Sequence, residues 1–217
     1  YDHPSELVGR QICAHGVQSP HISETLSEQD IFDAFFGSGQ HDVDDESRLL
    51  VPEGMTARAY AADIMRTQLS AVTGKDYSEA GDAEFTDSLM YNVAPAMSFW
   101  GGFYQNTIYR FRPNGLDPES SIMDIVILRP VPQEGPRPEP VPIMHLDFDE
   151  PVTLAGETMG EGLAVVFEQD AINLPWVQKG LRASRTGTVE FTNYQEQRLR
   201  LHHRLIDRLI AEGEAAQ

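Results

Sequence analysis

The spacing of apolar residues changes period between the middle of this chain and its two flanks. In the middle, three stretches alternate or run apolar and are rich in Ile, Val, Tyr and Phe, which is typical of β-strands. On either side, apolar residues recur every three or four positions, which indicates helices. This order favours an α+β fold in which a curved antiparallel sheet packs on long C-terminal helices. The strand-like stretches are DSLMYNVAPAMSF (87–99), GFYQNTIYRFRP (102–113) and SIMDIVILRP (121–130).

Three of the expected helices carry recognisable start or stop residues. Ser27 predicts the N-cap of a short helix. The amphipathic segment 56–73 is followed by Gly74, and glycine commonly ends a helix. Asn193 and Glu196 predict a capping box at the start of the last helix, which continues through QRLRLHHRLIDRLIAE.

Proline and glycine mark the connections between these elements. PNG at 113–115 predicts a hairpin with a longer loop between the second and third strands. The segment 129–142 contains six prolines, which excludes a helix or a central strand. We interpret it as a surface excursion rather than a polyproline docking peptide. TGTVEFT (186–192) predicts a short strand before the last helix.

Composition restricts the class of partner and the cellular compartment. With 217 residues the chain is expected to form a single domain, 1–217. Its 34 acidic and 16 basic residues give a net charge of −18, which repels phosphate backbones and anionic lipid headgroups, so neither nucleic acid nor membrane is an expected partner. One cysteine, Cys13, excludes an intrachain disulfide, and a cytoplasmic location is the expectation.

The segment LAVVFEQDAINLPWVQKGL (163–181) places a carboxylate within an apolar stripe. On a helix of 3.6 residues per turn, Asp170 shares one face with five aliphatic residues. A buried, ionised and unpaired carboxylate is strongly destabilising. Three compensations are open: an ion pair or partial solvation, a raised pKa suited to acid/base chemistry, or a bound metal ion. The predicted core-facing stripe consists of Leu163, Val166, Asp170, Leu174, Val177 and Leu181.

Histidine spacing does not complete a metal site around Asp170. None of the seven histidines stands three or four residues from another, the spacing of a two-histidine helical site. The chain also lacks a phosphate-binding loop, a dinucleotide fingerprint and a nucleophile elbow. Pro175 lies just beyond Asp170, and a proline inside a helix frees a backbone carbonyl and bends the helix, a distortion that favours a functional site here.

Three segments in order resemble the C-terminal catalytic domain of Rieske-type ring-hydroxylating oxygenase alpha subunits. They are the strand region from YNVAPAMSFW through FRPNG and SSIM to RPVP (91–132), the acidic helix VVFEQDAINLPWVQKGLRAS (165–184) and the closing helix NYQEQRLRLHHRLIDRLI (193–210). The resemblance implies a helix-grip (START-like) fold, in which a curved antiparallel sheet wraps a long helix. It also implies a mononuclear non-haem Fe(II) held by two histidines and one aspartate.

Only the aspartate of that iron site maps onto this chain, at Asp170. Asn173 and Gln178 on the same helix are the residues expected to support the site by hydrogen bonding. The family's histidine pair lies on an H-x-x-x-x-H helix, and its [2Fe-2S] Rieske cluster lies in a still earlier domain. This sequence contains neither the H-x-x-x-x-H motif nor the paired C-x-H and C-x-x-H motifs that hold the cluster. The resemblance therefore implies a catalytic domain that lacks both parts, and we expect it to be inactive by itself.

In the intact protein, the resemblance implies that dioxygen is activated to hydroxylate or demethylate an aromatic or other apolar substrate. The expected partners are this substrate, dioxygen, an electron-donating reductase or ferredoxin, and further copies of the chain in a trimer. The alternative is a non-catalytic helix-grip module that binds an apolar small molecule. The residues expected to line the substrate cavity are Asn92, Phe99, Trp100 and Phe103.

Overall fold

The computed structural model describes residues 2–5, 7–36 and 48–216. The chain groups into two compact units, Tyr1–Arg137 and Pro138–Gln217. We call them the N-terminal unit and the C-terminal unit and describe each by itself. The boundary lies in the proline-rich segment, which forms neither helix nor strand and is almost wholly exposed, as expected of a surface excursion.

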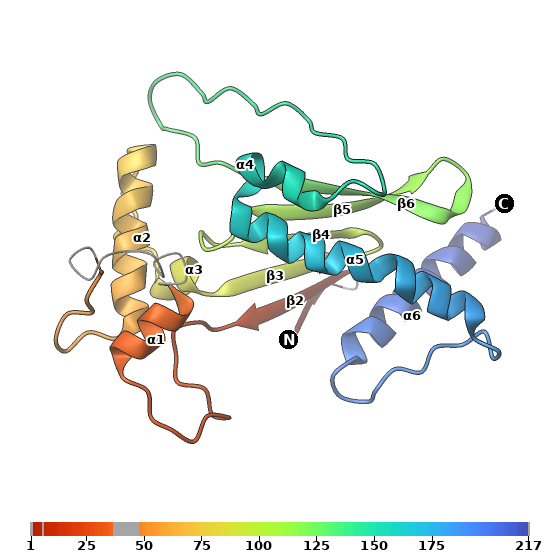
Figure 1. The fold of residues 1–217 in the computed structure, drawn as a ribbon, viewed down its shortest axis with the longest axis horizontal. Helices are drawn as coiled ribbons and strands as arrows, with labels where there is room; N and C mark the ends of the chain where they lie inside the picture. Colours follow the sequence, from red (N-terminus) through yellow and green to blue (C-terminus); the bar gives the residue numbers. More distant parts are fainter. Residues whose placement is uncertain (1, 6, 37–47, 217) are drawn as a thin grey trace. The chain divides into compact units, whose positions relative to one another are not determined.

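The N-terminal unit contains a six-stranded antiparallel sheet whose strands are neighbours in chain order (Figure 1). Together with the helices that follow it in sequence, this confirms the α+β class. Such a meander needs only short connections, since each strand pairs with the one before it. The strands are β1 (Asp2–Ser5), β2 (Val8–Cys13), β3 (Ser88–Val93), β4 (Met97–Gly101), β5 (Thr107–Asn114) and β6 (Asp117–Ile127).

The strand predictions were partly wrong. The stretch 87–99 was expected to be one strand, but it turns at Ala94 and Pro95 and supplies both β3 and most of β4. The hairpin between β5 and β6 was expected to have a longer loop, yet only Gly115 and Leu116 separate the strands. Gly115 has φ +64°, a left-handed conformation that glycine adopts without a steric penalty.

Two of the three helices of the N-terminal unit, α1 and α2, form its main apolar core. Thr56 caps α2, and Gly74 ends it in the left-handed conformation, as the sequence predicted for Gly74. Ile31 and Phe32 on α1 are buried against Ala57 and Ala61 on α2. The helices are α1 (Glu28–Phe35), α2 (Ala57–Thr73) and α3 (Asp82–Thr86).

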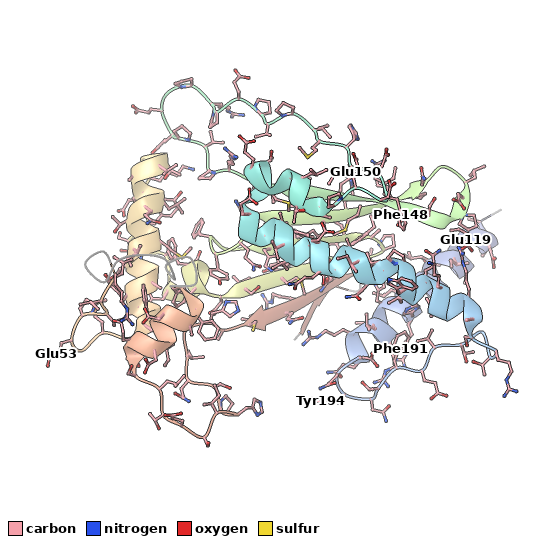
Figure 2. The ribbon with its side chains drawn as sticks, viewed as in Figure 1. Glu53, Glu119, Phe148, Glu150, Phe191 and Tyr194 are labelled. Carbon is pink, nitrogen blue, oxygen red and sulfur yellow. The ribbon has the colours of Figure 1, made fainter. Side chains whose placement is uncertain are left out.

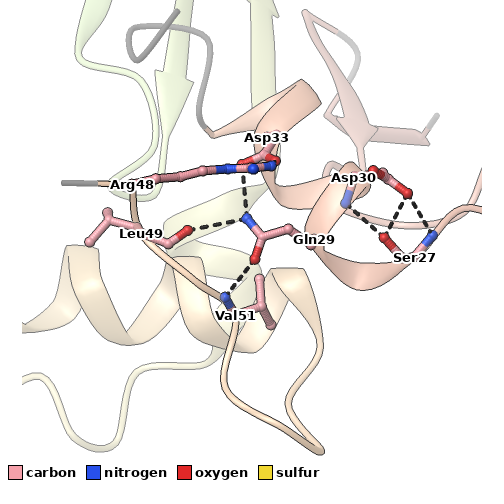
Figure 3. Close-up of polar contacts among 7 residues, drawn as sticks. All are labelled: Ser27, Gln29, Asp30, Asp33, Arg48, Leu49 and Val51. Atoms are coloured by element: carbon pink, nitrogen blue, oxygen red, sulfur yellow. Dashed lines mark hydrogen bonds and ion pairs between the residues drawn. The ribbon is translucent and has the colours of Figure 1, made fainter. Parts of the chain in front are cut away.

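The start of α1 is fixed by side-chain hydrogen bonds (Figure 3). Ser27 and Asp30 form the reciprocal bonds of a capping box, so the predicted cap is confirmed. Between these two residues in sequence lies Gln29. Its side-chain amide donates to the Leu49 carbonyl at 3.1 Å and accepts from the Val51 N–H at 2.8 Å. The amide thereby holds the chain that leads into α2 against α1.

A buried ion pair joins α2 to Asp87, which lies between α3 and β3. The Arg58 guanidinium bonds the Asp87 carboxylate and also donates to the His15 carbonyl at 3.0 Å. The hydrogen bond that Arg58 donates to Asp87 raises the pKa of Arg58 above its ordinary value. His15 in turn lies against the Phe35 ring, with centroids 5.7 Å apart. This network links four segments that are distant in sequence.

The C-terminal unit is helical. The predicted helix 163–181 is confirmed as α5, a continuous helix that contains Pro175. The predicted capping box of the last helix was wrong, because Asn193 accepts from Arg200 at 2.8 Å and Glu196 accepts from the Thr192 N–H at 2.6 Å. The elements of the C-terminal unit are η2 (Val152–Ala155), α4 (Gly156–Met159), α5 (Glu161–Ala183) and α6 (Gln197–Ala215).

The segment TGTVEFT does not form the predicted strand. A strand needs a hydrogen-bonded neighbour, and the structure assigns none to this segment. It forms part of the loop that leads into α6, where Phe191 lies 5.1 Å from the His203 ring and Tyr194 is strongly exposed (Figure 2). Among the described residues, no helix combines the length and apolar character needed to cross a bilayer.

Asp124 on β6 gives a prediction for acid pH. Its carboxylate accepts from Nε of Arg112 and Nε of Arg110, each at 2.8 Å, and these bonds lower its pKa from 3.8 to about 2, with Arg112 the larger cause. In an NMR titration of the carboxyl carbon, we expect Arg112→Gln to raise the Asp124 midpoint towards 3.8. Because the folded pKa is the lower one, the stabilisation by this carboxylate is present above pH 3.8 and lost as the pH falls towards 2. An unchanged midpoint in the variant would contradict the assignment.

Candidate functional site

Asp170 lies near the middle of α5 and is exposed. The predicted core-facing stripe is therefore wrong, because Val166, Leu174 and Val177 are also more than half exposed. The buried residues of the helix are Ala164 and Phe167, which lie on a neighbouring stripe.

Two short elements, η2 and α4, lie beside α5. Both short elements pack on the first turns of α5. The Thr153 N–H at the start of η2 donates to the Glu168 carboxylate at 3.2 Å. Ala164 and Phe167 are the buried residues of α5, whereas Asp170 is exposed. Because the Asp170 side chain is exposed, its ionised carboxylate does not pay the desolvation cost expected for a buried position. No compensating partner is therefore required.

The two residues expected to support Asp170 make different contacts. The Asn173 amide donates to the backbone carbonyl of Gln169 at 3.1 Å. Gln178 follows Asp170 by two turns, a separation of about 12 Å along the helix axis at 1.5 Å per residue. Gln178 is therefore too far away to hydrogen-bond the Asp170 carboxylate.

The described residues do not supply a donor set for iron. No group of three or more His, Cys, Asp or Glu side chains is placed to hold a metal ion in the described parts of the chain. The facial triad needs two imidazoles and one carboxylate. His202 and His203 lie on α6, where burial lowers the pKa of His202 and the His203 ring packs on Phe191. One exposed carboxylate does not fit the iron centre, so this chain cannot hold the ion with Asp170 alone.

Strand register divides the expected substrate residues between the two faces of the sheet. Asn92 pairs with Ser98, and Ser98 pairs with Tyr109, so these three side chains share one face. Trp100 lies on that face as well, two residues after Ser98. Phe99 lies on the opposite face. We call these surfaces the Asn92 face and the Phe99 face.

Phe99 and Phe103, the other two aromatic residues expected to line the substrate cavity, pack against other aromatic rings of the chain. The Phe99 ring stacks on Tyr91 at 5.1 Å on the Phe99 face. Phe103 lies in the loop between β4 and β5, where its ring stacks on the buried Phe85 at 4.9 Å and meets the Tyr77 ring edge-on at 5.2 Å. Phe99 therefore cannot line one cavity with Asn92 and Trp100, and Phe103 packs against Phe85 of α3 and Tyr77.

The Asn92 face holds an ordered cluster of polar and aromatic groups. The Trp100 indole N–H donates to the Ser88 hydroxyl at 2.9 Å, and this hydroxyl donates to the Gln105 amide oxygen at 3.1 Å. Tyr109 meets the Trp100 ring edge-on at 4.8 Å. The Ser98 hydroxyl donates to the Asn92 side-chain oxygen at 2.7 Å. Alternation within each strand indicated which residues share a face, but only the register between strands brought Tyr109 and Ser98 to the cluster.

A hollow of about 310 Å³ in the N-terminal unit lies between the loop at Gly16, α1 and the start of α2. Two charged side chains line it, and both are paired within the unit. Glu28 accepts from the Ala57 N–H at 2.7 Å, and Arg58 bonds Asp87. The hollow therefore presents no charged group prepared for a ligand.

Comparison of the chain with protein-family models, with curated proteins and with solved structures gives no match.

Proposed function

We propose that this chain is the catalytic portion of a Rieske-type non-haem iron oxygenase with a helix-grip fold, which hydroxylates or demethylates an aromatic or other apolar substrate. The observation that carries the proposal is the acidic helix: the motif E-x-D-x-x-N-L-x-x-V-Q-x-G forms one continuous helix, α5, with its central aspartate accessible to further ligands. The antiparallel sheet and the C-terminal helices are compatible with the same family.

In this proposal, two histidines from a preceding part of the intact protein join Asp170 as iron ligands. The iron and the Rieske cluster would supply dioxygen activation and electrons. The roles left to this chain are to hold the carboxylate on a rigid helix and to offer the substrate an aromatic surface. The Asn92 face, with Trp100 and Tyr109, is the surface suited to the second role. The cytoplasmic location, the trimer and the electron-donating partner belong to the same proposal.

The proposal is tested by measuring iron in the longer gene product. We expect Asp170→Ala to lose the mononuclear iron while the Rieske cluster keeps its visible absorbance, because one of three protein ligands is gone. The matched control is Asp207→Ala, which removes an exposed carboxylate from α6 and should leave the iron unchanged. Equal iron content in wild type and Asp170→Ala, with both folded, would refute the ligand role.

A second function is favoured by the absence of a donor set for iron in the described residues. In this alternative the chain is a non-catalytic helix-grip module that binds an apolar small molecule on the Asn92 face. The two functions differ in their dependence on metal. Ligand binding by a protein whose full-length form contains no mononuclear iron would favour the module over the oxygenase.

A further inference from the structure

The Asn92 face combines an apolar wall with a polar anchor. Trp100 and Tyr109 form the wall in an edge-to-face pair, a geometry that orients a further ring packed beside them. Both side chains are half-buried, so part of each ring remains accessible. The indole N–H is already bonded to Ser88, which fixes the orientation of the Trp100 ring.

Asn92 provides the anchor. Its side-chain oxygen is occupied by the Ser98 hydroxyl at 2.7 Å, and this bond orients the amide. The Asn92 Nδ2 group carries two donors, and the structure gives them no acceptor among the described residues. A half-buried amide with unused donors gains free energy when a ligand oxygen accepts from it.

The charge of the chain restricts the acceptor. The net charge of −18 disfavours the approach of an anionic ligand to the protein. A neutral carbonyl oxygen accepts a hydrogen bond without that repulsion.

We propose that Asn92 donates a hydrogen bond to a neutral aromatic ligand that carries a carbonyl-type acceptor, while Trp100 and Tyr109 pack on its ring. This inference rests on the proposed function, because it names the chemical class of substrate for the same chain. In this proposal, Asn92 selects ligands that carry a hydrogen-bond acceptor. Trp100 and Tyr109 contribute the part of the affinity that all aromatic ligands share.

Two probe molecules of nearly equal shape test the proposal. Acetophenone carries a carbonyl oxygen, and α-methylstyrene replaces that oxygen with a methylene group. Titrated into the nitrogen-labelled 217-residue chain and followed by NMR, both should shift the Trp100 indole N–H signal. Only acetophenone should shift the Asn92 side-chain amide signals. We expect acetophenone to bind about three- to tenfold more tightly, the usual effect of one neutral hydrogen bond.

Controls within the chain identify the site. The Trp176 indole signal, which Trp176→Phe assigns, and the Asn106 amide, which donates to the Leu128 carbonyl at 2.7 Å, should stay unchanged. Asn92→Leu should bind both probes equally, whereas Tyr109→Leu should weaken both. Equal affinities in the wild type, or an Asn92 amide that does not move, would overturn the proposal. Should Asn92→Leu not fold, the wild-type comparison alone decides.

This measurement involves no iron, so it separates two kinds of failure. Selective acetophenone binding together with unchanged iron in Asp170→Ala would refute the oxygenase and retain the ligand site. Loss of iron in Asp170→Ala together with equal binding of the two probes would retain the oxygenase and refute the role of Asn92.

Discussion

Asp87→Ala is expected to lower the free energy of unfolding by about 3 to 5 kcal/mol, the usual cost of removing one partner from a buried ion pair. The Asp87 side chain is 7% exposed and the Arg58 side chain 21% exposed. Without the carboxylate, the Arg58 guanidinium would remain largely buried and would keep only its bond to the His15 carbonyl. Chemical denaturation followed by circular dichroism measures the loss.

Two further variants test the cause of that loss. Replacing both partners, with Arg58→Met and Asp87→Leu, should recover most of the stability, because no buried charge is then left unpaired. The exposed pair of Arg48 and Asp33 is the matched control (Figure 3), and Arg48→Ala should cost less than about 1 kcal/mol. If Asp87→Ala cost no more than Arg48→Ala, the ion pair would not be the link between α2 and the sheet.

Phe85→Ala is expected to cost about 3 to 5 kcal/mol, the range for truncating a large ring in a core. Phe85 is 0% exposed and lies on α3. Its ring contacts Phe103 and Tyr77, and the Arg66 guanidinium lies 5.0 Å from its centroid. The truncation therefore removes packing from three side chains and leaves a cavity between the helices and the loop that joins β4 to β5.

Leu116→Ala is the control for this truncation, since Leu116 in the β5–β6 turn is fully exposed and should change stability by less than about 0.5 kcal/mol. The same measurement bears on Phe103. If Phe103 belongs to the core, as its stacking on Phe85 indicates, Phe103→Ala should be destabilising too, and Phe85→Ala combined with Phe103→Ala should not be additive. Purely additive losses would contradict a shared cluster.

Local sequence signals predicted much of the helical structure. The helix predicted over 56–73 is confirmed as α2, and Gly74 ends it as expected, because a left-handed stop depends on residues adjacent in sequence. The six prolines of 129–142 likewise exclude regular structure wherever the segment lies. By contrast, β2 was not predicted, because Gly9, Arg10 and Gln11 interrupt its apolar residues and because it pairs with β3, which is distant in sequence.

The candidate site also combines features that the local sequence predicts with features that depend on contacts between distant segments. Helical periodicity correctly grouped Asp170 with five aliphatic residues, since the angle between neighbours is a local property of the α-helix. Which stripe of α5 is buried depends on tertiary packing, and the buried residues are Ala164 and Phe167 instead. On the sheet, Phe99 and Trp100 were expected to line one cavity, but they lie on opposite faces, and the register between strands places Tyr109 and Ser98 beside Asn92 and Trp100.

The sequence by itself determined the α+β class, the bounds of α2, the helical state of 163–181 and the resemblance that singles out Asp170. Each of these depends on backbone preferences or on residue types within a few turns of chain. Only the tertiary structure decided that Asp170 is exposed, that Phe103 stacks on the buried Phe85 and that Asn92, Trp100 and Tyr109 share a face. Burial and strand register arise from contacts between distant segments, and no local pattern encodes them.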